Sequence, residues 1–122
     1  MNTKQLDSWV KKMGDVWEKK QANKIADLFE DKFLYYETPS GKPYATKKEI
    51  IKLWEEVPNS QKDINFNHDI IICNKDLGIV HWTAKFTRIP SSEKANLDGI
   101  FLIKLNNKVL CTLFKMWCVA TN

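Results

Sequence analysis

The chain has 122 residues, of which 43% are hydrophobic and 28% are charged, a composition typical of one folded domain. Its formal charge is +4, but Arg88 is the only arginine among nineteen basic residues, and this shortage argues against nucleic-acid recognition. No apolar run approaches the roughly 18 residues that a membrane span needs. The N-terminus also lacks an apolar signal segment, so we expect one cytoplasmic domain over residues 1–122 with no nucleic-acid or membrane partner.

Neither metal nor disulfide chemistry is indicated by the sequence. The three cysteines show no Cys-x-x-Cys spacing, and the two histidines do not complete a zinc-ligand pattern. We therefore expect no disulfide framework, no metal site and no cofactor.

The first half of the chain has the 3.6-residue period of amphipathic helices. An apolar stripe predicts a helix over residues 4–20, and Asn23 is placed to cap a short second helix. Thr46 and Glu49 form a capping-box pattern that opens a third helix, which we expect to end before Pro58. The stripe of the first helix consists of Leu6, Trp9, Val10, Met13 and Trp17.

An aromatic-rich segment, residues 32–38, predicts a first strand, and from residue 64 onward the period of the pattern is two. Four long strands follow, joined by turns short enough for hairpins. Helices first and strands last indicate an α+β fold, in which a curled, mainly antiparallel sheet wraps around the N-terminal helices. We expect this sheet to form a cone with an interior pocket.

Three segments carry a family resemblance: HWTAKFTR at 81–88, LDGIF at 97–101 and FKMW at 114–117. They resemble the SnoaL-like branch of the nuclear transport factor 2-like superfamily, whose members have the cystatin-like cone fold. The resemblance covers essentially the whole chain. It implies the fold, but the superfamily includes isomerases, cyclases, dehydratases and binding domains, so activity must be argued from the site.

One member, the ketosteroid isomerase, implies a site that can be compared residue by residue. Its strand aspartate corresponds to Asp98, but the place of its helix tyrosine falls on Met13, which cannot donate a hydrogen bond. The place of its catalytic base falls on Thr38, with Glu37 next to it and expected on the opposite face of the strand. The resemblance therefore does not predict ketosteroid isomerisation.

Two residues are candidates for acid–base chemistry, Asp98 and His68. Asp98 shares a strand face with Ile100 and Leu102, so we expect it inside the cone, either as a protonated acid facing a ligand or as a carboxylate bound to a backbone amide or water. His68 is interpreted either as a general base paired with Asp98 or as a core histidine. His81 lies on a half-polar face, which favours solvent or an interface.

We expect the pocket to bind a small hydrophobic or aromatic molecule. The alternatives are an isomerase, cyclase or dehydratase that uses Asp98 and His68, or a protein-interaction module that docks through its sheet face. The sequence leaves open whether the aromatic side chains fill the cone or line a slot. The predicted ligand-binding residues are Met13, Trp17, Tyr36, Trp54, His68, Trp82, Phe86, Asp98, Phe114 and Met116.

The late strands are apolar on both faces, because Phe101 and Ile103 alternate with Ile100 and Leu102. One domain's helices can cover only one side of a curled sheet. The sequence therefore predicts a homodimer through the sheet, with Phe101, Ile103, Leu113 and Trp117 on the covered surface.

Overall fold

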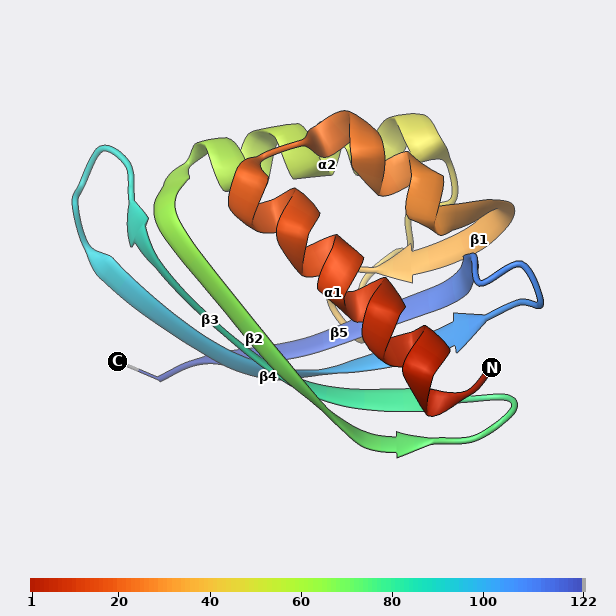
Figure 1. Ribbon diagram of the computed structural model, residues 1–122. Coiled ribbons are helices and arrows are strands. Elements are labelled where there is room, and N and C mark those ends of the chain that lie inside the picture. Colours follow the sequence, from red (N-terminus) through yellow and green to blue (C-terminus); the bar gives the residue numbers. More distant parts are fainter. Residues whose placement is uncertain (122) are drawn as a thin grey trace.

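A computed structural model describes residues 1–121 of the chain. It has the α+β architecture predicted from the sequence, with helices first and a five-stranded open sheet after them (Figure 1). Over these residues, no helix combines the length and the apolar character that crossing a bilayer requires. The elements are α1 (Thr3–Lys19), the 3₁₀ helix η1 (Ala22–Leu28), β1 (Phe29–Tyr36), α2 (Lys47–Asn59), β2 (Gln61–Cys73), β3 (Gly78–Arg88), β4 (Lys94–Leu105) and β5 (Cys111–Ala120).

Capping side chains fix the start of both α-helices. Asn2 accepts from the backbone N–H of Gln5 while the Gln5 side chain accepts from the N–H of Asn2, a capping box that the sequence analysis did not identify. The predicted box at α2 is confirmed, with Glu49 N–H donating to the Thr46 hydroxyl at 3.2 Å. Lys20, in the left-handed region with φ 54°, ends α1.

Three local predictions are wrong. The predicted second helix is a 3₁₀ helix, η1, and Asn23 lies inside it instead of capping it. The first strand begins at Phe29, three residues earlier than predicted. Pro58 lies inside the last turn of α2, where the missing N–H removes one hydrogen bond and the helix ends one residue later.

The sheet is a four-stranded antiparallel meander with one parallel strand added at its edge. The strand order is β1-β5-β4-β3-β2, and β1 pairs with β5 in parallel. Figure 1 shows that the sheet curls and that both α-helices lie on its concave side, which we call the inner face. The convex side is the outer face.

Aromatic rings fill the space between α1 and the inner face. Trp82 stacks on Phe101 with ring centroids 4.9 Å apart, and Trp9 donates through its indole N–H to the Leu28 carbonyl at 2.8 Å. Gly99 leaves the room that Trp82 occupies, because a Cβ there would lie 2.7 Å from the indole. The Trp82 N–H itself is buried without a hydrogen-bond partner among residues 1–121.

The alternation along β4 is the reverse of the one predicted. Phe101, Ile103 and Leu105 are buried under the helices, whereas Ile100 and Leu102 are on the outer face and partly exposed. The expectation that Phe101 and Ile103 face outward is therefore wrong. From Ala95 to Leu105 the inner set is wholly apolar, whereas the outer set includes Asn96, Asp98 and Lys104. The polarity of the whole strand therefore distinguishes the two faces, and the error lies in the inward placement of Asp98.

Candidate functional site

A cavity of about 70 Å³ lies between the two α-helices and the β1–β5–β4 end of the inner face, and it is open on one side. This is several times the space that one water molecule needs. Apolar side chains form nearly all of its wall. The lining residues are Met13 and Trp17 of α1, Tyr35 and Glu37 at the end of β1, Leu53, Trp54, Val57 and Pro58 of α2, Phe101 of β4, and Phe114 and Met116 of β5.

Five of the ten predicted ligand-binding residues line this cavity. They are Met13, Trp17, Trp54, Phe114 and Met116. Trp82 and Phe86 are buried in the core beside it and do not line it. Tyr36 points to the outer face, where the Lys115 ammonium lies 5.1 Å from the centre of its ring. The preceding residue, Tyr35, takes the place in the cavity wall.

Tyr35 provides a buried hydroxyl in the cavity wall. It is 4% exposed, its ring stacks on Phe114 at 4.7 Å, and its oxygen accepts from the indole N–H of Trp54 at 3.1 Å. Because the oxygen is the acceptor in that bond, the hydroxyl proton is left for another acceptor. Burial raises the pKa of Tyr35, and the nearby Glu37 carboxylate raises it further, so the hydroxyl remains a donor at neutral pH.

Glu37 is the one charged residue that lines the cavity. It follows β1 directly and shares the inner side with Tyr35, two residues before it. Its carboxylate has the Tyr44 hydroxyl 3.5 Å away, the long limit of a hydrogen bond. Burial, followed by this carboxylate, raises the pKa of Tyr44. The cavity therefore has one carboxylate near its rim and one hydroxyl in its wall.

The structure does not bring His68 and Asp98 together. His68 lies opposite Trp82 in the β2–β3 ladder, on the inner face, and its Nε2 is 2.7 Å from the Asp7 carboxylate of α1. Asp98 lies opposite Thr83 on β3, on the outer face. The expected acid–base pair across the cone is therefore wrong, and neither residue lines the cavity.

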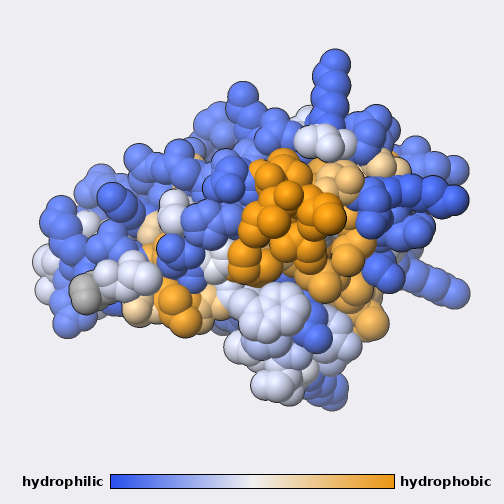
Figure 2. Space-filling model, turned by 90° about the horizontal axis from the view of Figure 1, so that it is seen from below, coloured by the Kyte–Doolittle hydropathy of each residue, from blue (hydrophilic) through white to orange (hydrophobic). Residues whose placement is uncertain are grey.

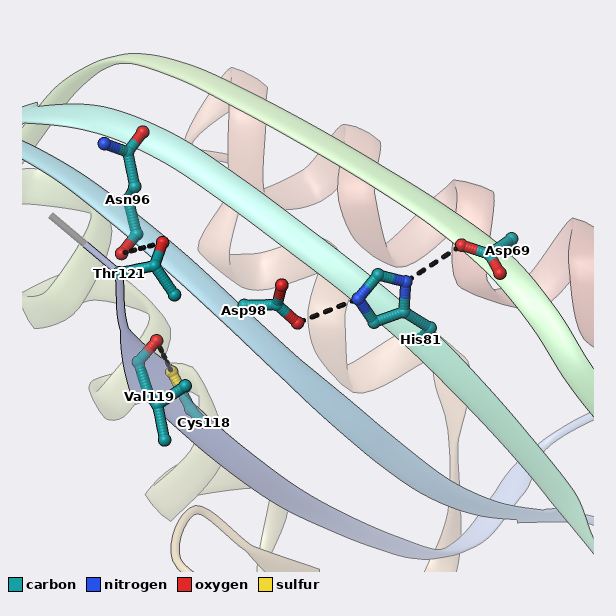
Figure 3. Close-up of polar contacts among 7 residues, drawn as sticks. All are labelled: Asp69, His81, Asn96, Asp98, Cys118, Val119 and Thr121. Atoms are coloured by element: carbon teal, nitrogen blue, oxygen red, sulfur yellow. Dashed lines mark hydrogen bonds and ion pairs between the residues drawn. The ribbon is translucent and has the colours of Figure 1, made fainter.

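Asp98 binds the other histidine instead. His81 lies between two carboxylates, with Nε2 2.8 Å from Asp98 and Nδ1 3.0 Å from Asp69 (Figure 3). The hydrogen bond to Asp98, followed by the one to Asp69, raises the pKa of His81. Three adjacent strands supply these side chains. The cluster lies on the outer face, so it does not act on a molecule in the cavity.

The outer face also has an apolar patch (Figure 2). Trp117 is 39% exposed and Val119 63% exposed, both on β5, so part of the surface predicted for dimerisation is indeed uncovered in the monomer. We use the term outer patch for these residues and their apolar neighbours on the same face. Its members are Leu34, Ile72, Ile79, Ile100, Leu102, Leu113, Trp117 and Val119.

Metal ligation has no support within the described part of the chain. No group of three or more His, Cys, Asp or Glu side chains there is arranged to hold a metal ion. The side chains of Asp69, His81 and Asp98 are likewise not arranged to hold a metal ion.

Sequence reasoning missed Tyr35 and Glu37 as cavity residues. The relevant signal was the i, i+2 spacing, which puts both on one strand face, but the neighbouring Leu34 and Tyr36 are equally suited to a buried face. Pairing with β5 decides the matter, since Tyr35 lies beside Phe114 and Tyr36 beside Lys115.

Comparison with known proteins supports this architecture. Among solved structures, the chain is similar to the epoxide hydrolase/cyclase-like enzyme SalBIII, which is described with a role in pyran ring formation in the polyether salinomycin. The two superpose with a TM-score of 0.82 at 9% sequence identity, and the match covers 98% of this chain and 95% of SalBIII. An NTF2-like protein of unknown function from Exiguobacterium sp. 255-15 gives 0.75 at 13% identity, with 93% and 99% covered. A conserved protein from Planctomyces limnophilus DSM 3776 gives 0.74 at 13% identity, with 95% and 94% covered.

At these identities the likeness shows the fold alone. No curated protein sequence matches the chain. The model of the SnoaL-like domain, however, matches residues 10–110, which include α1 from Val10 onward, all of β1 to β4 and most of the cavity wall. The chain therefore belongs to the SnoaL-like domain family.

Proposed function

We propose that the protein binds a small hydrophobic or aromatic molecule in the cavity between the helices and the sheet. The observation that supports this function is the unfilled volume of about 70 Å³ among large apolar side chains. Protein interiors are otherwise close-packed, so an open space lined by apolar side chains leaves apolar surface in contact with solvent, at a cost of roughly 25 cal/mol per Å². An apolar solute that enters the cavity recovers part of this free energy.

The wall chemistry favours an apolar solute over ordered water. A stably bound water needs two to four polar partners, and the polar side-chain groups of the wall with capacity for a further hydrogen bond are the Tyr35 hydroxyl and the Glu37 carboxylate. Water away from these two groups therefore has no polar side chain to bind. The indole N–H groups of Trp17 and Trp54 are already used, by Gln61 at 2.8 Å and by Tyr35 at 3.1 Å. Both indoles line the cavity, although Trp17 also packs against Phe66 and Trp82.

Nuclear magnetic resonance tests this function directly. Titration with benzyl alcohol should shift the indole N–H signals of Trp17 and Trp54 and leave that of Trp9 in place. Leu53→Phe, which fills the cavity from α2, should abolish the shifts, whereas Leu102→Phe on the outer face should not. Equal shifts in both variants would show that the probe binds elsewhere.

A second candidate function is acid–base catalysis in the same cavity, supported by the position of Tyr35 and Glu37 on one side of β1. A carbonyl compound bound there would lose a proton from the adjacent carbon to Glu37. The C–H electron pair would form the double bond of the enolate, the carbonyl π pair would move to the oxygen, and that oxygen would accept a hydrogen bond from the Tyr35 hydroxyl, which keeps its proton. This replaces Asp98 and His68 as the catalytic pair. Enzyme activity is also named for SalBIII.

Deuterium exchange distinguishes the two candidates. Wild-type protein should speed incorporation of deuterium beside the carbonyl of cyclopentanone in D₂O if the pair is catalytic, and Glu37→Gln should remove the effect. Binding without exchange would leave only the first function.

Ketosteroid isomerisation is still not expected. Met13 lines the cavity but has no donor, and Asp98 lies on the outer face, so neither proposed holder of the enolate oxygen acts there. Loss of one oxyanion donor typically lowers the rate about 10²–10³-fold. Conversion of a Δ5-3-ketosteroid by wild-type protein, followed by absorbance, would contradict this expectation.

We also propose that the outer patch is the contact surface of a homodimer. The patch is apolar (Figure 2), and charged side chains of both signs border it, Asp69 and Asp98 on β2 and β4, and Lys104 and Lys115 on β4 and β5. A two-fold contact between copies can therefore pair opposite charges while it buries the patch. Sedimentation at micromolar concentration should give about 29 kDa, twice the chain mass of 14.3 kDa, for the wild type and one chain mass for Trp117→Lys. A monomeric wild type would favour a different protein as the partner.

A further inference from the structure

The electrostatic character of the cavity is one-sided. Glu37 is the one charged side chain in its wall, and among residues 1–121 no ion pair includes it. Its polar contact is the Tyr44 hydroxyl at the long distance of 3.5 Å. A carboxylate beside an apolar cavity without a protein cation is a ready partner for a cation that a ligand brings.

The aromatic walls favour the same sign of charge. Trp17 and Trp54 meet edge to face with centroids 6.4 Å apart, and Tyr35 stacks on Phe114, so several ring surfaces border one space. The face of an aromatic ring is the negative part of its quadrupole and attracts cations. An anion in this cavity would meet both these rings and the Glu37 carboxylate.

The surroundings of Tyr44 contain charges of both signs. The carboxylates of Glu37, Glu49 and Glu56 raise the pKa of Tyr44 after the effect of burial, and backbone hydrogen bonds, followed by the Lys42 ammonium, lower the pKa of Glu49. The preference for a cation therefore rests on Glu37, which lines the cavity itself.

Building on the proposed binding function, we infer that the ligand is an organic cation: a small amine or quaternary ammonium carried on an apolar or aromatic body. The apolar body would lie among Trp17, Trp54 and Phe114. The ammonium group would lie at the open side, beside Glu37. The cavity thus selects by charge as well as by size.

Three ring-matched probes test this inference: benzylamine, which is cationic at neutral pH, benzyl alcohol, which is neutral, and benzoate, which is anionic. Dissociation constants are measured from the indole N–H signals of Trp17 and Trp54. Benzylamine should bind about tenfold more tightly than benzyl alcohol, since it adds an ion pair and a cation–π contact, and benzoate should bind most weakly. An increase in salt from 20 to 200 mM should weaken only the binding of benzylamine.

Glu37→Gln and Glu55→Gln form a matched pair of variants. Both remove one negative charge, but Glu55 is an exposed residue of α2 that does not line the cavity. Glu37→Gln should bring the dissociation constants of benzylamine and benzyl alcohol within about twofold of each other, chiefly by weakening the binding of benzylamine. Glu55→Gln should retain the preference for the amine.

The possible results separate the charge preference of the cavity from its binding function. If benzyl alcohol binds as tightly as benzylamine to the wild type, or if Glu37→Gln retains the preference, the inference of a cationic ligand is wrong while the binding function stands. If no probe shifts the two indole signals at millimolar concentration, the binding function and this inference both fail. The salt dependence is measured on the wild type and needs no variant to fold.

Discussion

Replacement of Phe101 by alanine tests the inner face of β4, where the structure departs most clearly from the sequence analysis. Phe101 is 1% exposed and its ring lies 4.9 Å from Trp82 and 4.8 Å from Phe114. Truncation of a buried phenylalanine lowers the free energy of unfolding by about 3–5 kcal/mol. The residue also borders the open cavity, so solvent can enter the new space, and we expect the lower end, about 3 kcal/mol.

Ile100→Ala is the matched control on the next residue. Ile100 faces outward between His81 and Trp117, its neighbours across the strands, and has no layer of protein above it. Cross-strand contacts of this kind contribute roughly 0.2–1 kcal/mol each, so truncation should lower the free energy of unfolding by about 1 kcal/mol.

Urea unfolding followed by far-ultraviolet circular dichroism measures both variants, because that signal does not depend on the tryptophans beside Phe101. Since the fold as a whole is expected to be stable by roughly 5–15 kcal/mol, both variants should still fold. Measurement at two protein concentrations separates any effect on dimerisation. An equal or larger loss for Ile100→Ala at the lower concentration would refute the assignment of Phe101 to the inner face.

Three further predictions concern the core and the histidine cluster. Trp9→Phe should lower the free energy of unfolding by about 1–3 kcal/mol more than Trp82→Phe does. The first variant breaks a buried hydrogen bond, whereas the second removes an unpaired N–H, and chemical denaturation measures the difference. Gly99→Ala should lower the free energy of unfolding by about 3 kcal/mol or more, which a lower melting temperature reports, since the new Cβ would lie 2.1 Å from a backbone carbonyl oxygen of β5. Asp98→Asn should lower the pKa of His81 in a proton NMR titration. Because the folded-state pKa of His81 is raised, the variant should lose more stability at pH 5.5 than at pH 9, and an equal loss at both would contradict the ion pair.

The elements were predictable from the sequence because their signals are local. The capping box at Thr46 and the apolar stripe that ends at Trp17 identify two helices, and the change of period after residue 60 marks the meander. The errors at η1 and Pro58 both concern a short helical segment or the end of a helix. A single turn of helix depends on contacts with other elements more than on its own sequence.

The facing of the strands depends on the polarity of a whole strand. A strand pattern tells which residues share a face, but only a difference in polarity between the two faces tells which one is covered. On β4 this difference exists, because Asn96, Asp98 and Lys104 share the outer face, but the match of Asp98 to another enzyme favoured the opposite facing. The actual partner of Asp98, His81, lies 17 residues away in the chain, and the other nitrogen of that histidine binds Asp69.

The same ambiguity on β1 decides what the cavity can do. If Tyr36 faced inward, Glu37 would lie outside and the cavity would be an uncharged slot. Because β1 pairs with β5 so that Tyr35 lies beside Phe114, the inward side of the strand ends in a hydroxyl and then a carboxylate. The register of one edge strand thus places a negative charge beside an aromatic cavity. Both the ligand preference and any acid–base activity depend on that register, which only the assembled sheet determines.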